Sequence, residues 1–287
     1  MRKVAFLSMD TLEAFECYDD LLVSPLKKLN WKVDTISWKR NDVDWKEYDA
    51  VIVRSTWDYQ DDVNEFINKL ELINSKTHLE NNLEIMKWNI DKTYLKELEE
   101  KDIKIVPSIW RESFDSNEIS SFFDTLNTDE IIIKPTVSAN ADNTFRLKLE
   151  NLDTHTSILD TAFKKRPFVV QPFMKNIITE GEYSLFYFGG QYSHTILKTP
   201  KQNDFRVQEE HGGILKLVKP NEAMQVKSKE ILNKLEHDLL YARIDFVRTS
   251  DNEFALMELE LIEPSLYFNM DPESPKRFAE IFDEWMG

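Results

Sequence analysis

The chain has 287 residues, and its 52 acidic against 36 basic residues give a formal net charge of −16. Because nucleic acids and anionic membranes bind positively charged surfaces, this balance argues against either of them as the main partner. A single cysteine, Cys17, excludes a disulfide scaffold and a metal site built from several cysteines. The first apolar run is too short for a signal peptide and no run reaches about 18 apolar residues, so we expect a cytoplasmic protein.

Glycine is scarce in this chain. Only 6 glycines occur, whereas an average usage of about 7% would give roughly twenty. Neither the GxGxxG fingerprint of dinucleotide-binding folds nor the GxxxxGK[ST] phosphate loop is present. A loop that binds phosphate in this protein therefore has to use other small residues.

The first eighty residues alternate between strand and helix patterns. This order predicts a small open α/β domain, in which the loops at the carboxyl ends of the strands face the ligand. Residues 54–59, which follow a short buried strand, form such a loop. We expect strands at 3–8, 31–38 and 50–53, and helices at 18–29 and 63–73.

The rest of the chain is predicted to be an α+β body with mostly antiparallel strands. Its helices are expected at 84–100, 116–126, 221–237 and 274–285. The expected strands are 103–107, 131–135, 144–149, 168–173, 183–188, 192–198, 212–218, 240–247 and 253–261.

Lys134 ends a β-branched run and precedes Pro135, which keeps it extended at the end of a buried strand. The small and Asn/Asp residues of 135–144 follow, and their amides, with the hydroxyls of Ser138 and Thr144, could wrap a polyphosphate. Taken alone, Lys134 is better explained as a solvated lysine, and the loop 135–144 as an ordinary polar hairpin. The phosphate interpretation depends on the features that accompany them.

Two pairs of charged residues lie near the C-terminus. Period-two alternation places Arg243 with Asp245 on one strand face, and Glu258 with Glu260 on one face of the next strand. A hairpin around 250–252 would bring the three carboxylates to one spot, a donor set that suits Mg²⁺ or Mn²⁺ bound together with nucleotide phosphates. An acidic, half-exposed hairpin is the alternative explanation.

The segment 169–174 turns sharply at Pro172, and the carboxylates of Glu180 and Glu182 follow it. A backbone edge with a nearby carboxylate provides what adenine and ribose need. The five histidines show no HxH or HxxxH spacing, so we do not expect zinc. His211, beside a glycine pair, could still reach a substrate.

Taken in this order, the motifs resemble the ATP-grasp fold from about residue 80 to the end of the chain. They are most similar to the glutathione synthetase and RimK-like ligases, and 54–59 with 257–264 also resemble the subgroup containing D-cycloserine-forming synthetase. The resemblance implies an N-terminal open α/β domain (1–80), a first ATP-grasp lobe (81–174) and a second lobe that carries the metal site (175–287).

The resemblance also implies the roles of individual residues, with ATP and Mg²⁺ (or Mn²⁺) as cofactors. It implies that Lys92 and Lys134 contact the phosphates of ATP, together with Ser138 of the loop 135–144. It also implies that Gln171 and Phe173 contact adenine and that Glu182 or Glu180 binds the ribose. Asp245, Glu258 and Glu260 would bind the metal, Arg243 would stabilise the transferred phosphoryl group, and Lys198 and Arg206 would contact phosphate or substrate carboxylate. For the substrate, Arg54, Asp58, His211 and Glu263 are candidates, although a surface ion pair explains Arg54 and Arg206 equally well.

Two positions depart from the family pattern. The phosphate loop, normally rich in glycine, has none between 135 and 146. Glu260 stands where many relatives have Asn, which adds negative charge to the metal site.

The activity that the resemblance implies is ATP-dependent ligation of a small, amino-acid-like carboxylate to an amine through an acylphosphate. A phosphotransferase on the same fold, an intramolecular ring-closing ligase, and a nucleotide-binding regulator without turnover are the alternatives. The joint presence of the predicted ATP and metal residues argues against the regulator. The partners expected are the two small substrates and, with exposed aromatics in the first domain, a second copy of the chain.

Overall fold

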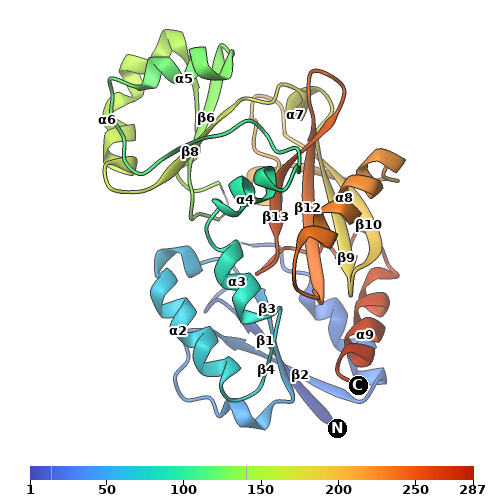
Figure 1. The fold of residues 1–287 in the computed structure, drawn as a ribbon. Coiled ribbons are helices and arrows are strands. Elements are labelled where there is room, and N and C mark those ends of the chain that lie inside the picture. Colours follow the sequence, from blue (N-terminus) through green and yellow to red (C-terminus); the bar gives the residue numbers. More distant parts are fainter. Residues whose placement is uncertain (14, 140) are drawn as a thin grey trace.

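The computed structural model describes residues 1–13, 15–139 and 141–287, so Asn140 of the predicted phosphate loop lies outside the described residues. Three sheets organise these residues, one in each of the three segments outlined above (Figure 1). The two chain ends lie close together, and Arg2 forms an ion pair with Asp283. The boundaries between the domains stay a prediction.

The N-terminal sheet is parallel, with the strand order β2-β1-β3-β4. Helices cover both of its faces: side chains of α2 and α3 pack on one face and those of α1 and α9 on the other, which confirms the α/β expectation. The strands are β1 (Arg2–Ser8), β2 (Trp31–Ser37), β3 (Ala50–Ser55) and β4 (His78–Glu80). The helices are α1 (Val23–Lys28) and α2 (Val63–Asn74), with 3-10 turns at Asp19–Leu22, Trp45–Glu47 and Tyr59–Asp61.

Two expectations for this domain are corrected. The segment 18–29 is not one helix: a 3-10 turn precedes α1, whose Pro25 lies in the first turn, where a missing amide proton costs nothing. Strand β4 was not expected, because a three-residue strand is too short to show alternation.

The middle sheet is antiparallel in the order β5-β8-β6-β7, and α5 and α6 pack on it around a core of their own. The elements are β5 (Ile109–Arg111), α5 (Ile119–Leu126), β6 (Glu130–Pro135), β7 (Phe145–Lys148), α6 (Leu152–Phe163) and β8 (Phe168–Pro172), with a 3-10 turn at Leu149–Asn151. The sequence analysis missed α6. The strand expected at 103–107 is wrong: only Ile105 bridges to Leu256, and Pro107, which has no amide proton, follows.

The helix expected at 84–100 is broken into α3 (Leu83–Asn89) and α4 (Tyr94–Glu100). In the break, the Asp91 carboxylate accepts a hydrogen bond from the amide of Thr93, a local contact that competes with the helix. The amide of Lys92 instead donates to the carbonyl of Thr136 at 2.8 Å. The break therefore attaches Lys92 to the predicted phosphate loop.

The C-terminal sheet is antiparallel in the order β11-β10-β9-β12-β13. Its strands are β9 (Glu182–Phe188), β10 (Gln191–Thr199), β11 (Ile214–Leu217), β12 (Tyr241–Arg248) and β13 (Phe254–Glu260). The helices are α7 (Asn176–Thr179), α8 (Glu222–Lys234) and α9 (Ser274–Trp285), and a 3-10 turn lies at Glu209–His211.

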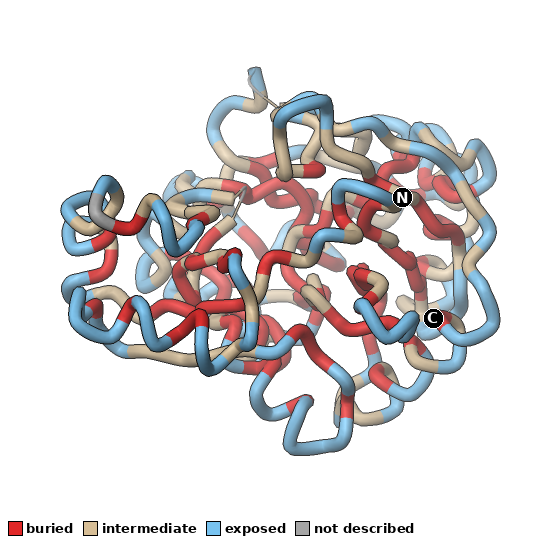
Figure 2. Tube along the Cα trace, turned by 90° about the horizontal axis from the view of Figure 1, so that it is seen from above, coloured by how far each residue is buried: buried red, intermediate tan, exposed pale blue. Residues whose placement is uncertain are grey.

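A continuous buried interior connects the N-terminal and C-terminal sheets, while exposed residues lie along the outside (Figure 2). Asn89 joins α3 to the end of β13: its side-chain amide donates to the carbonyl of Leu259 at 2.8 Å, and its oxygen accepts from the amide of Leu261 at 2.9 Å. Since these atoms are buried, they fix the α3–α4 break beside β13. Among the described residues, none of the helices combines the length and apolar character needed to cross a membrane.

Candidate active site

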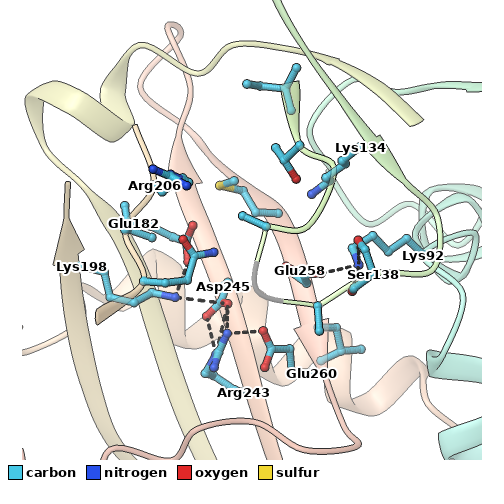
Figure 3. Close-up of a pocket in the computed structure, with 18 of the residues that line it drawn as sticks. Lys92, Lys134, Ser138, Glu182, Lys198, Arg206, Arg243, Asp245, Glu258 and Glu260 are labelled. Atoms are coloured by element: carbon cyan, nitrogen blue, oxygen red, sulfur yellow. Dashed lines mark hydrogen bonds and ion pairs between the residues drawn. The ribbon is translucent and has the colours of Figure 1, made fainter. Parts of the chain in front are cut away.

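One cavity collects side chains from all three segments of the chain. Figure 3 shows cations and carboxylates from β6, β9, β10, β12 and β13 facing the same space. Of the predicted site residues, the cavity is lined by Lys92, Lys134, Ser138, Gln171, Phe173, Glu182, Lys198, Arg206, Arg243, Asp245, Glu258, Glu260 and Glu263. Residues far apart in sequence, such as Lys92 and Glu263, are thus brought together.

Strand register creates the acidic centre of the cavity. Arg243 lies opposite Glu260, and Asp245 lies opposite Glu258, on the paired strands β12 and β13. The Arg243 guanidinium contacts Glu260 and donates to Asp245, with an Nη2–Oδ2 distance of 2.9 Å. The strand register therefore brings Asp245, Glu258 and Glu260 to the same part of the hairpin, and their predicted convergence on one metal ion stays a prediction.

Lys198 of β10 completes this network from the other side. Its ammonium contacts Glu182 and lies 3.5 Å from Oδ2 of Asp245. Burial alone would raise the pKa of Asp245, but Arg243 and Lys198 outweigh burial and hold this pKa below its usual value. Asp245 is therefore ionised at neutral pH.

The broken helix supplies a second cation. The Nζ of Lys92 donates to the carbonyl of Ser138 at 2.8 Å and lies 3.2 Å from Oε1 of Glu258. Burial would raise the pKa of Glu258, but Lys92 and Lys134 reverse that effect and lower it. Lys92 thus links the predicted phosphate loop to the acidic centre.

Lys134 differs from the other cations of the cavity. Within the described residues, its ammonium makes no hydrogen bond or ion pair, while Lys92, Lys198 and Arg243 are each paired with a carboxylate. Burial lowers the pKa of Lys134, and the charges of Glu258, Glu182 and Asp245 compensate for the desolvation only in part. Such a cation at a cavity wall favours an anionic ligand.

The predicted metal ligands face the cavity but do not form a preassembled centre. Over the described ranges, no three His, Cys, Asp or Glu side chains group closely enough to hold a metal ion. Asp245 and Glu260 are instead neutralised by Arg243. Hard carboxylate oxygens on neighbouring register pairs nevertheless fit the donor chemistry of a divalent cation. Burial, with help from Asp245 and Glu258, raises the pKa of Glu260 to about 7.

Part of the cavity wall is apolar. The Gln171 side chain donates to the Ser108 hydroxyl at 2.9 Å. The predicted adenine contact of Phe173 needs a correction, because its amide already donates to the carbonyl of Glu130 at 2.8 Å, which leaves only its carbonyl for a ligand. The apolar lining includes Ile132 and a small packed cluster of Val106, Met174, Ile177, Val207 and Met257.

Four of the predicted residues, Glu180, Asp58, His211 and Arg54, do not line the cavity within the described structure. Glu180 forms a bidentate pair with Arg248, so Glu182 is the ribose candidate that faces the cavity. Asp58 accepts from the Trp38 indole at 2.7 Å and contacts Lys39. His211 lies in the 3-10 turn after Gln208, also outside the lining.

Arg54 is buried rather than substrate-facing. Its guanidinium pairs with Asp19 at 2.8 Å and donates to the carbonyl of Pro264 at 3.2 Å. The adjacent Trp57 indole donates to the carbonyl of Glu263 at 2.9 Å. The loop at 54–59 therefore holds the backbone of 263–264, and only Trp57 and Tyr59 of this loop reach the cavity.

The sequence analysis missed several residues of the site. Tyr94 lines the cavity and its hydroxyl accepts from the amide of Leu259 at 2.8 Å, and Asn89 joins α3 to the same strand. Ser265 and Tyr267 also line the cavity. Their signal was their position directly after the predicted metal-binding strand.

Comparison with known proteins identifies the family. Residues 104–265, more than half of the chain, match the family described as "Prokaryotic glutathione synthetase, ATP-grasp domain". The chain belongs to the ATP-grasp family. Residues 4–81 match the N-terminal domain of D-cycloserine synthetase DcsG.

Individual relatives agree with this membership. The cycloserine biosynthesis protein DcsG of Streptomyces lavendulae is 26% identical to this ATP-grasp chain over 254 residues, 83% of each protein. The crystal structure of D-cycloserine synthetase DcsG is similar with a TM-score of 0.88 at 22% identity, over 99% of this chain and 100% of that one. D-alanine–D-alanine ligase of Bacillus anthracis, solved with ATP, gives 0.71 at 15% identity, over 100% and 97%. The ATP-grasp ligase PsnB, solved with Mg and ADP, gives 0.70 at 13% identity, over 99% and 98%.

These findings confirm the expected fold of an open α/β domain followed by ATP-grasp lobes. They also identify the activity as ATP-dependent carboxylate–amine ligation and do not favour the phosphotransferase alternative.

The buried Arg54–Asp19 pair generates a stability prediction for this ATP-grasp ligase. Arg54→Ala should lower the free energy of unfolding by about 3 kcal/mol, because it leaves the Asp19 carboxylate poorly solvated and without its cation. Urea unfolding followed by circular dichroism measures this change. Arg40→Ala, which breaks an exposed pair with Asp42, is the matched control and should have little effect. Equal effects of the two substitutions would contradict the assigned role of Arg54.

Proposed function

We propose that this ligase activates a small, amino-acid-like carboxylate as an acylphosphate and then joins the acyl group to an amine. In the first step, a carboxylate oxygen attacks the γ-phosphorus of ATP, and the bond to the β–γ bridging oxygen breaks to release ADP. In the second step, the neutral amine attacks the acyl carbon, phosphate leaves, and the amine gives up one proton. The chain supplies positioning and charge neutralisation for both steps.

The observation that carries this proposal is the Lys134 ammonium, which faces the cavity without a partner among the described residues. A transferable phosphate is a ligand that it could neutralise. Arg243, on the neighbouring sheet, is one of the cations at the acidic centre. Charge developing on phosphoryl oxygens between these two cations would be stabilised by groups already in place.

A divalent cation, most simply Mg²⁺, fits this scheme. Asp245, Glu258 and Glu260 are the residues that would hold it, and Arg243 would release Glu260 to do so. The metal supplies Lewis-acid neutralisation of the phosphate oxygens. The related ligase PsnB, solved with Mg and ADP, supports this choice.

The ring-closing reaction is a second candidate for the ligase. It is favoured by the likeness to DcsG, which extends through the N-terminal segment that carries Trp57 and Tyr59. In that reaction the attacking nitrogen and the activated carboxylate belong to one molecule. The cytoplasmic location and the homodimer stay predictions.

Trapping with hydroxylamine tests the proposed function. Hydroxylamine attacks an acylphosphate to give a hydroxamate and phosphate, whereas a phosphorylated alcohol gives none. We expect carboxylate-dependent release of ADP together with hydroxamate when Mg²⁺, ATP and small amino acids are supplied. A ring-closing substrate would release ADP without any added amine. Release of ADP with a stable phosphorylated product would instead support a phosphotransferase.

The position of Lys134 leads to a prediction for ATP binding. Lys134→Ala should weaken ATP binding about 10- to 100-fold, the effect of losing a charge-assisted contact worth about 1.5–3 kcal/mol. Calorimetric titration with Mg·ATP measures the change. Lys148→Ala, which removes an exposed lysine from the paired strand β7, is the control and should bind as the wild type does. Unchanged binding by the Lys134 variant would move the phosphate site elsewhere.

The raised pKa of Glu260, about 7, predicts proton release on metal binding. Below this pKa the carboxyl is protonated, and a divalent cation favours the ionised form, so Mg·ATP affinity should rise with pH between about 6 and 8. Calorimetry in buffers of different ionisation enthalpy counts the released protons. Glu260→Gln keeps a ligand oxygen but removes the titration, so its proton release should fall. The same release in this variant and the wild type would show that Glu260 does not titrate.

A further inference from the structure

Glu263 lies in the same cavity as the phosphate and metal candidates but at a different part of its wall. Strand β13 ends at Glu260, and the chain then bends at 262–263, which turns Glu263 into the cavity instead of continuing the strand alternation. Trp57 and Tyr59, from the N-terminal segment, line the cavity with it. Glu263 follows Glu260 by three residues, so the distance between their Cα atoms is at most about 10 Å. A small amino acid together with the groups that contact it spans a similar distance.

The backbone at Glu263 is held on both sides. The Trp57 indole donates to the carbonyl of Glu263 at 2.9 Å, and Arg54 donates to the carbonyl of the next residue, Pro264, at 3.2 Å. Asn89 holds the amide of Leu261 from the other side. A side chain carried on a backbone fixed in this way is preorganised for a ligand.

The Glu263 carboxylate has no counter-ion among the described residues. Of the neighbouring cations, Lys92 is already paired with Glu258. Arg243 is already paired with Asp245 and Glu260. Burial, reinforced by Glu260 and Glu258, raises the pKa of Glu263 to about 8. A cation supplied by a ligand would relieve both the desolvation of this carboxylate and its repulsion by its neighbours.

We propose that Glu263 binds the ammonium group of the amino-acid substrate whose carboxylate the enzyme activates. The indole of Trp57 and the phenol of Tyr59 add aromatic surface, which also favours a cation over an anion. Glu263 then acts as a specificity-determining residue, because it selects α-amino acids over the matching hydroxy acids and unsubstituted acids. This inference rests on the proposed function and adds the substrate's second charged group to it.

Glu263→Gln separates charge recognition from neutral hydrogen bonding. Glutamine has nearly the same shape and can donate a hydrogen bond as a protonated glutamate would, but it cannot neutralise an ammonium group. The control is Glu284→Gln, which removes one negative charge from an exposed position on α9.

The experiment measures ADP release and hydroxamate formation with Mg·ATP and hydroxylamine. The probes are D- and L-alanine and D- and L-serine, each compared with lactate, propionate or glycerate at equal concentration. We expect at least one amino acid to be preferred by wild type, and Glu263→Gln to lower its kcat/KM about 10- to 100-fold. The variant should bind Mg·ATP as the wild type does, and Glu284→Gln should keep the preference.

The possible failures are distinguishable. Full activity of Glu263→Gln with amino acids would overturn the ammonium proposal, and so would a wild-type preference for the acids without an amino group. Both results would leave the proposed ligase function intact, since hydroxamate would still form. If no hydroxamate formed with any of the carboxylates, that result would count against both the ammonium proposal and the small-acid proposal. The measurement of Mg·ATP binding would still test the nucleotide site.

Discussion

The register of β12 against β13 is the constraint on which the rest of the site depends. It places a guanidinium opposite one carboxylate and a second carboxylate opposite a third, so that Arg243, Asp245, Glu258 and Glu260 share one wall. A shift of β13 by one residue would turn Glu258 and Glu260 to the opposite face of the sheet. Buried charges at this density are tolerated only because cations from other elements approach them. The positions of Lys92 and Lys198 follow from this requirement.

The helix break at 90–93 illustrates how the cavity is assembled. A continuous helix over 84–100 would satisfy its own backbone, but the break lets Lys92 bond to the predicted phosphate loop through both its amide and its ammonium. Asn89 and Tyr94, on either side of the break, fix it to β13. Local helix propensity is thus given up for contacts that connect a loop of the middle segment with the acidic strand of the C-terminal sheet.

Two side chains of opposite charge on the cavity wall still need a counter-charge from a ligand. Lys134 and Glu263 are, within the described residues, ionisable groups without an ion pair, whereas most of the charge between them is internally neutralised. Such an arrangement complements a ligand set that is negative at one end and positive at another. The N-terminal domain holds 263–264 through Trp57 and Arg54, and it also supplies Trp57 and Tyr59 to the cavity wall.

The sequence by itself determined the parts that depend on local pattern. Period-two alternation placed Arg243 with Asp245 and Glu258 with Glu260 on common faces, and α9 begins and ends where its helical pattern predicts. Only the tertiary structure decided which charged residues reach the cavity. Arg54 and Glu180 have the chemistry of ligand contacts, but Asp19 and Arg248, distant in sequence from them, pair with them instead. A side chain's charge is a property of the residue, whereas the partner that neutralises it is set by long-range packing, which a local pattern does not contain.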